Sequence, residues 1–484
     1  MSGTLHQAYI RPMGVRIDLA DGISAKNGWT LMYASFATIG FLTFINTGQT
    51  FVLNANLGMS SDEQGRITGA LSFWNEAITI ALAAPFGVLA DRVGRRPVFC
   101  FGMIAMAFGY ALYPYADSVA DVFVARTMYS FGTAAAAGMI GIVGQDYPRE
   151  YSRGKLIAWT GVMNALGVIV TAVVFGRIMF GALEDAGMTA KQQGLYTFWS
   201  VAVVLLISAW ILKWGLKGGV PPEAEEKQPI KDLFKSGYIN GKNPRIALAY
   251  ASAFVARSDL VVIGAFTNLW GSVYGQSQGM SPAEATRAGA LIFIIAQVFG
   301  LVWAPIMGVI IDRVNRVSAV TFGMGFAAIG YGSMFFVDDP TNPIYYPLFG
   351  LLGIGQISAF FASQALIGQE APAKERGAII GFFSGSGAIG ILVATSVGGI
   401  LFDTWMLVGP FIFVGALNFI IFAFGLVVRM KSPGMMPDEI KAMRAARLEA
   451  LAADKESASA ALAAAQPVVT SADETNASET KRED

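Results

Sequence analysis

Long apolar runs constrain the fold of this chain more than any other feature. Twelve runs have the length of roughly 18 to 25 residues that crosses about 30 Å of hydrocarbon. Hydrophobic residues make up 54% of the 484-residue chain and charged residues 14%, far from the averages of soluble domains. We therefore predict an all-α polytopic membrane protein. The predicted spans lie near 31–53, 66–90, 97–115, 119–145, 155–180, 195–216, 246–274, 287–311, 317–337, 345–368, 377–402 and 407–429.

Charge and residue usage exclude several classes of function. The 34 basic and 34 acidic residues balance, so the sequence does not predict a nucleic-acid partner. The sequence contains a single cysteine, Cys100, and a single histidine, His6. These are too few to form a disulfide framework or a Cys/His metal centre. No phosphate-binding motif with strand–helix context is present. We predict no metal, no cofactor and no enzyme activity.

Lysine and arginine are distributed unequally between the two sides of the predicted membrane. One side holds only Arg66, Arg177, Lys191 and Arg287. Cytoplasmic loops carry the excess of basic residues, so both termini are predicted to be cytoplasmic, with the bacterial inner membrane as the expected location. The basic groups of the side that carries the termini are the N-terminal arm, Arg92, Arg95, Arg96, Arg149, Arg153, Lys155, the 217–245 loop, Arg313, Arg316, Lys374, Arg376 and the C-terminal tail.

The chain contains two related halves. The segment GVLADRVGRR at residues 87–96 recurs, in weaker form, as GVIIDRVNR at 308–316. Other matches keep a separation of 220 to 224 residues, which indicates duplication of a six-span unit. These matches are Gly58-Met59-Ser60 with Gly279-Met280-Ser281, Arg66 with Arg287, Ala84-Pro85 with Ala304-Pro305, and Gly144-Gln145-Asp146 with Gly368-Gln369-Glu370.

The duplication and the linker chemistry around Pro221-Pro222 divide the chain into five parts. Two six-helix bundles are expected, one on either side of a cytoplasmic linker. The predicted parts are an N-terminal arm (1–28), an N-terminal bundle (29–216), the linker (217–245), a C-terminal bundle (246–430) and a tail (431–484) that is partly helical and then disordered.

The loop at 87–96 and its copy resemble the signature of the major facilitator superfamily. Arg126 with Gly132 in the fourth span is similar to an arginine–glycine signature of that family. The resemblance covers about residues 30–430 and matches no single subfamily. It implies twelve helices in two bundles, alternating access, and a substrate cavity lined largely by helices 1, 4, 7 and 10.

The resemblance also implies a latch that closes the cytoplasmic side. Gly87 would permit close helix approach, and Asp91 could accept hydrogen bonds from a helix N-terminus. In the alternative interpretation, these charges serve only to fix the topology. Besides Gly87 and Asp91, the candidate latch residues are Arg92, Arg95, Asp146, Asp312, Arg313, Glu370 and Arg376.

Four charged residues lie well inside predicted spans, away from the span ends: Glu76, Arg126, Arg257 and Asp259. Each costs about 2.5–3.5 kcal/mol to insert at a helix centre, which makes it a functional candidate. Arg257 and Asp259 are two positions apart, about 200° around a helix, so they cannot both face one cavity. Glu76 or Asp259 could exchange a proton coupled to substrate movement. The alternative is a static ion pair that fixes helix packing.

Six amides could add polar lining to a cavity: Asn46, Gln49, Asn75, Asn164, Gln297 and Gln356. Any one of them could instead form a hydrogen bond between helices. The sequence as a whole predicts a monomeric secondary active transporter of a small organic solute, such as a carboxylate or other metabolite, with protons as the coupling ion and lipid as the surrounding partner. A drug or metabolite exporter of the same fold is one alternative. A sensor or assembly scaffold that moves no solute is the other.

Overall fold

The computed structural model describes residues 8–219, 230–372 and 375–436, with a few positions beyond. Residues up to Gly434 form one compact unit. In the second unit, which starts at Met435, the Met436 N–H donates to Glu439 at 2.8 Å. Within the described residues twelve helices are long and apolar enough to cross a membrane, which confirms the predicted fold class.

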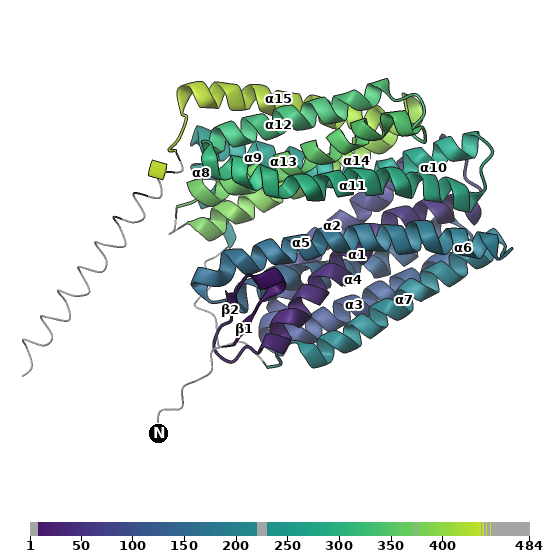
Figure 1. Ribbon diagram of the computed structural model, residues 1–484, viewed down its shortest axis with the longest axis horizontal. Helices are drawn as coiled ribbons and strands as arrows, with labels where there is room; N and C mark the ends of the chain where they lie inside the picture. The colour runs from purple at the N-terminus through teal and green to yellow at the C-terminus, as the bar shows by residue number, and fades with distance from the viewer. Residues whose placement is uncertain are drawn as a thin grey trace, which may run out of the picture. The chain divides into compact units, whose positions relative to one another are not determined.

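The first six spans lie together in one group, shown in purple to blue in Figure 1. The fifth span contains a π-helical segment of eight residues, where the helix is widened. The elements of this group are α1 (Ala25–Ala55), α2 (Gln64–Val93), α3 (Arg95–Leu112), η2 (Tyr113–Tyr115), α4 (Val119–Asp146), η3 (Glu150–Ser152), α5 (Arg153–Thr171), the π-helix η4 (Ala172–Met179), α6 (Phe180–Asp185) and α7 (Ala190–Gly215).

The last six spans form the second group, shown in green to yellow in Figure 1. Its first span also contains a π-helical segment. The elements are α9 (Pro244–Val262), the π-helix η5 (Ile263–Thr267), α10 (Asn268–Ser277), α11 (Pro282–Arg313), α12 (Arg316–Gly332), η6 (Ser333–Phe336), η7 (Pro343–Tyr345), α13 (Tyr346–Glu370), α14 (Arg376–Thr404) and α15 (Gly409–Lys431).

The N-terminal arm and the linker contain structure that the sequence pattern did not indicate. Strands β1 (Tyr9–Ile10) and β2 (Ile17–Asp18) form an antiparallel hairpin around η1 (Pro12–Gly14), and Leu19 pairs with Pro148 after α4. The linker contains α8 (Ile230–Asn240). The predicted helix and disorder of the tail lie almost entirely outside the described residues.

Tyr147 anchors the region between α4 and the linker. Its carbonyl accepts the Ala20 N–H at 2.9 Å, and its hydroxyl accepts the Lys217 N–H at 2.9 Å. Burial raises the pKa of Tyr147 to about 12, so the hydroxyl stays neutral at physiological pH. The arm and the start of the linker are therefore held against the first group of helices.

Close glycine packing repeats in the two halves, at positions 221 residues apart. A Cβ added to Gly102 in α3 would lie 2.7 Å from the main-chain nitrogen of Ala136 in α4. One added to Gly323 in α12 would lie 2.7 Å from the main-chain carbonyl oxygen of Ser358 in α13. Small residues let membrane helices approach closely, so both helix pairs depend on these positions.

Replacing Gly323 by Ala is expected to destabilise the protein by about 1–3 kcal/mol, because the new methyl group overlaps the main chain of α13. The measurement is the melting temperature of purified protein in detergent. Gly308→Ala is the matched control, since no atom lies within 4 Å of a Cβ there. Equal melting temperatures for the two variants would contradict the packing argument.

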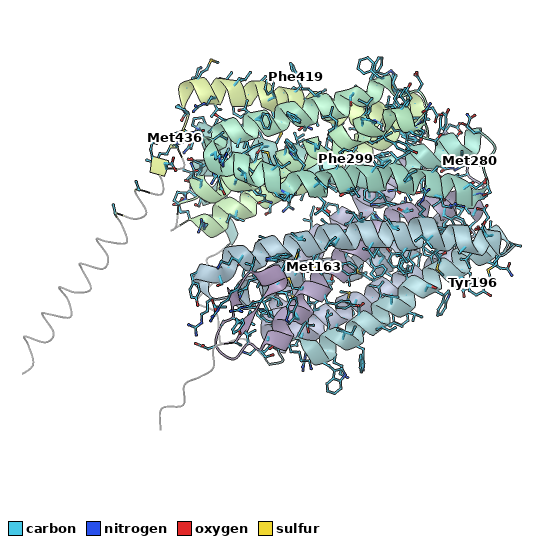
Figure 2. The ribbon with its side chains drawn as sticks, viewed as in Figure 1. Met163, Tyr196, Met280, Phe299, Phe419 and Met436 are labelled. Carbon is cyan, nitrogen blue, oxygen red and sulfur yellow. The ribbon has the colours of Figure 1, made fainter. Side chains whose placement is uncertain are left out.

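Large apolar side chains cover much of the outer surface of the helices. Phe419 on α15 is 60% exposed and Tyr196 on α7 is 46% exposed, and both lie at the margins of the bundle in Figure 2. In a soluble protein such a surface would aggregate, whereas in a bilayer it contacts lipid chains. Together with the twelve spans, this surface makes the protein an integral membrane protein.

Candidate functional site

The two ends of the bundle differ in how the halves meet. We call the end where α1 begins and α15 ends the terminal end, and the opposite end the distal end; Figure 1 shows them at left and right. Helix α2 of the first half packs along α14 of the second, and η4 and α5 pack along α11. These crossings bring polar groups of the two halves together.

At the distal end, Asp403 joins the halves. Its carboxylate, at the end of α14, accepts the main-chain N–H groups of Gly65 at 2.8 Å and Arg66 at 2.7 Å, at the start of α2. A carboxylate at a helix N-terminus satisfies free N–H groups and interacts favourably with the helix dipole. Asp403 therefore fastens α2 to α14.

A second distal contact also joins the two halves, and the internal duplication relates it to the first. Glu184 in α6 accepts a hydrogen bond from the Ser281 hydroxyl and lies 3.4 Å from the Arg287 guanidinium of α11. Arg287 corresponds to Arg66 in the duplication. We call Asp403, Glu184 and their partners the distal latch. Sequence reasoning noted the two arginines but missed both acids, although each acid ends a predicted span or follows it closely.

Loss of both acids is expected to weaken closure of the distal end. Hydrogen bonds to charged groups contribute about 1.5–3 kcal/mol each, so Asp403→Asn with Glu184→Gln should shift the population toward a distal-open state by about tenfold or more. Spin labels at Ser61→Cys and Thr404→Cys, in a Cys100→Ser background, would report a longer distance. An unchanged distance distribution would rule out the latch.

Polar contacts between the halves continue deeper into the bundle. The Thr47 hydroxyl of α1 donates to the Asn268 side-chain oxygen of α10 at 2.8 Å. The neighbouring Asn46 faces Gly264 of η5, where an added Cβ would lie 3.1 Å from the Asn46 amide nitrogen. Asn46 thus lies at the interface between the halves.

Glu76 of α2 and Arg257 of α9 lie at mid-depth in opposite halves of the protein. Glu76 lies twelve residues into α2, about 18 Å from its distal start at about 1.5 Å per residue. The two half-buried side chains interact electrostatically without a direct ion pair among the described contacts. Arg257 packs on Gly387 of α14, where an added Cβ would lie 2.3 Å from the Arg257 Cδ. A missing side chain thus makes room for the guanidinium.

Many helical glycines toward the terminal end have no close neighbour beside their Cα atoms. A Cβ added at any of a group of glycines would meet no atom within 4 Å, in contrast to the tight distal crossing of α2 and α14. The group includes Gly87 of the candidate latch. Its other members are Gly138, Gly141, Gly144, Gly154, Gly161, Gly308, Gly368, Gly377, Gly381 and Gly385.

Arg126 and Asp259 lie inside the separate halves. Arg126 is 3% exposed, its guanidinium lies 5.1 Å from the Tyr129 ring centroid, and its Nε and Nη1 have no hydrogen-bond partner among the described residues. Asp259 is fully buried and accepts a hydrogen bond from Asn418 of α15 at 2.9 Å. Arg257 and Asp259 have different neighbours, consistent with their spacing of about 200° around the helix.

Four of the other amides contact partners within one half. Gln49 donates to Thr68 at 3.3 Å, and Asn75 accepts from Ser130 at 2.9 Å. The remaining amides are Gln297, which donates to Gln356 at 3.5 Å, and Asn164, which is half-buried in α5.

The candidate cytoplasmic latch forms ion pairs inside each half. Arg95 lies 2.5 Å from Asp91 and 3.2 Å from Asp146. The second copy repeats the first of these, with Arg316 lying 3.2 Å from Asp312. The other members are Glu370, 3.1 Å from Arg245; Arg376, whose guanidinium donates to the Gly368 carbonyl at 3.0 Å; and Arg92 and Arg313, which are exposed.

The protein consists of two six-helix groups with polar residues at mid-depth between them. This arrangement is the fold of a secondary transporter. The sequence pattern of the Major Facilitator Superfamily matches residues 29–395. The chain belongs to this superfamily, which confirms the resemblance stated from the loop motif.

Sequence and structural similarity to individual proteins supports this assignment. The chain is 28% identical to magnetosome protein MamH of Paramagnetospirillum magneticum over 395 residues, covering 80% of this chain and 88% of MamH. It is 23% identical to the multi-drug resistance efflux pump PmrA of Streptococcus pneumoniae, covering 71% and 82% of the two chains. The crystal structure of nucleoside transporter NupG superposes with a TM-score of 0.62 at 13% identity, covering 83% and 98%, and shares the fold.

Proposed function

We propose that this transporter moves a small organic solute, such as a carboxylate or other metabolite, by proton-coupled alternating access. The observation that carries the proposal is the placement of Glu76 and Arg257 at mid-depth on opposite halves. The distal contacts lie on one side of this pair, and the helical glycines without a close neighbour lie on the other. We interpret this arrangement as a distal-closed state, with both termini cytoplasmic and residues 29–216 and 246–430 as the rocking units.

The charges of the pair suggest how solute and proton are linked. A solute carboxylate would bind the Arg257 guanidinium through charge-assisted hydrogen bonds. It would then place negative charge near Glu76, which would favour protonation of that side chain. Binding of the anion and of the proton would thus assist each other. Asn46, at the same interface, would supply a hydrogen bond to the solute.

Reconstitution tests this proposal. Purified protein in proteoliposomes, with a pH-sensitive dye inside, would be exposed to a panel of mono- and dicarboxylates, amino acids and nucleosides. Solute-dependent proton movement is expected for at least one carboxylate. Saturable ligand binding without flux would instead support the sensor or scaffold alternative.

Export of drugs or metabolites is the second candidate, supported by the likeness to the efflux pump PmrA. The two directions make different predictions for the same vesicles. An exporter that works by antiport would accumulate its solute in vesicles that are more acidic inside than outside. A proton symporter would accumulate it when the outside is the more acidic. A lipophilic cation, which carries no carboxylate for Arg257, would be transported only by the exporter.

A further inference from the structure

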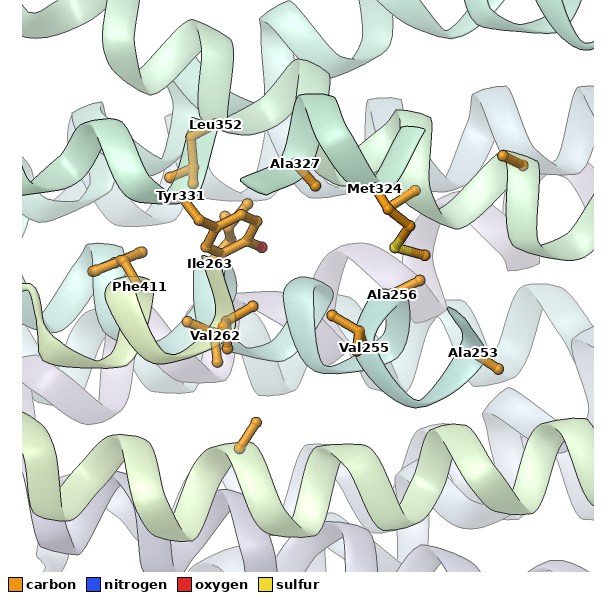
Figure 3. Close-up of a cluster of buried hydrophobic side chains, with 14 of the residues drawn as sticks. Ala253, Val255, Ala256, Val262, Ile263, Met324, Ala327, Tyr331, Leu352 and Phe411 are labelled. Carbon is orange, nitrogen blue, oxygen red and sulfur yellow. The ribbon is translucent and has the colours of Figure 1, made fainter. Parts of the chain in front are cut away.

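Asp259 lies where a charged carboxylate would have no compensation. It is 0% exposed, and the helices packed against α9 contribute Tyr331 from α12 and Asn418 from α15. Figure 3 shows Tyr331 beside Val262 and Ile263 in the surrounding apolar cluster. The nearest cation along the chain, Arg257, interacts with Glu76 instead. An unpaired charge buried in this way would cost several kcal/mol.

The hydrogen-bond donors around Asp259 are already in use. Asn418 donates one amide N–H to Asp259 Oδ1 at 2.9 Å and the other to the Val414 carbonyl at 3.1 Å. The Tyr331 hydroxyl donates to the Asp259 main-chain carbonyl at 2.9 Å. Two buried oxygens then have no partner among the described residues, namely Asp259 Oδ2 and Asn418 Oδ1.

We propose that Asp259 carries a proton on Oδ2 and donates it to Asn418 Oδ1, which makes the two side chains a reciprocal acid–amide pair. This single proton satisfies both oxygens at once, whereas two bare acceptors cannot satisfy each other. Turning the Asn418 amide over would put its oxygen against the carboxyl group, so that arrangement requires a proton as well. The ligand of this site is therefore a proton, held inside the second half.

The position of the pair gives its proton an effect on the transport site. The Asp259 carbonyl also accepts the Ile263 N–H, at the point where α9 passes into the π-helix η5. π-Helical turns within α-helices are frequently found at functional sites. Loss of the proton would leave Oδ2 and Asn418 Oδ1 as opposed acceptors and loosen α9 from α15. The same helix carries Arg257 two residues earlier, so its guanidinium would move relative to Glu76. This last step rests on the proposed transport; the protonated state does not.

Infrared spectroscopy of the full-length protein in lipid nanodiscs tests the protonated state. Asp259→Asn is expected to remove a carboxylic-acid C=O band at neutral pH. The matched control is Asp121→Asn, which should remove no such band because the Asp121 carboxylate is exposed to solvent and accepts a hydrogen bond from the Ser118 hydroxyl at 2.7 Å. An unchanged acid band in Asp259→Asn would overturn the proposal.

The exchanged double variant, Asp259→Asn with Asn418→Asp, distinguishes loss of the acid–amide pair from a general folding defect. It restores an acid–amide pair with the proton on the other helix, so both the acid band and the melting temperature should return. Failure of the band to return in folded protein would also overturn the pair. Proton flux in proteoliposomes is a separate readout: a protein that moves no solute would refute the proposed function and leave the band in place.

Discussion

Glu76→Gln is expected to lower solute accumulation driven by a pH gradient by about tenfold or more. The glutamine keeps the shape of the side chain but cannot bind or release a proton. It also removes the negative charge that interacts with Arg257 across the two halves. The measurement is uptake of the solute identified in the carboxylate panel, in proteoliposomes with an imposed gradient.

Exchange transport separates coupling from general damage. Without a gradient, the Glu76→Gln protein should still exchange internal for external solute, because Arg257 remains available to bind it. The matched control is Glu63→Gln, an exposed acid just before α2, which should accumulate solute like the wild type. Wild-type accumulation by Glu76→Gln would show that this residue carries no coupled proton. If Asp259→Asn also accumulated normally, neither acid would be the coupling site.

Gly69→Val is expected to prevent tight closure of the distal end. A Cβ on Gly69 of α2 would lie 2.4 Å from the Thr395 carbonyl of α14, and one on Gly399 would lie 2.6 Å from the Gly65 carbonyl. The two main chains are too close for a branched side chain. Overpacking of this kind costs about 1–3 kcal/mol, which corresponds to a shift of about 5- to 150-fold toward the distal-open state.

The shift can be read from the same distal spin-label pair, and transport should slow because one of the two end states becomes unfavourable. Gly381→Val provides the matched control on α14, since a Cβ at that position meets no atom within 4 Å. It should leave the distal distance unchanged. Identical distance distributions for the two variants would show that the crossing of α2 and α14 does not hold the distal end shut.

Most of the helical framework could be predicted from local sequence. The predicted span at 66–90 corresponds to α2 at Gln64–Val93, and the predicted span at 377–402 corresponds to α14 at Arg376–Thr404. The fifth span was predicted to end near 180, yet η4 and α6 continue it to Asp185. The N-terminal hairpin could not be foreseen, because its neighbours, such as Pro148, are more than a hundred residues away in the sequence.

The candidate site was predictable as a set of residues but not as an arrangement. The cost of burying charge selected Glu76, Arg126, Arg257 and Asp259 from the sequence. Which of them meet depends on helix rotation and on the crossing of α2 with the second half. Those features placed Glu76 near Arg257 and left Arg126 among aromatic rings.

The sequence by itself determined the class of this protein: twelve apolar spans, a duplicated unit and a loop motif sufficed for a transporter of the Major Facilitator Superfamily. Those features are local, since hydrophobic length and repeated motifs need no knowledge of neighbours. Only the tertiary structure decided that Asp403 and Glu184 fasten the distal end and that Asp259 meets Asn418. These contacts join segments far apart in the chain, so their energies depend on packing that no local pattern records.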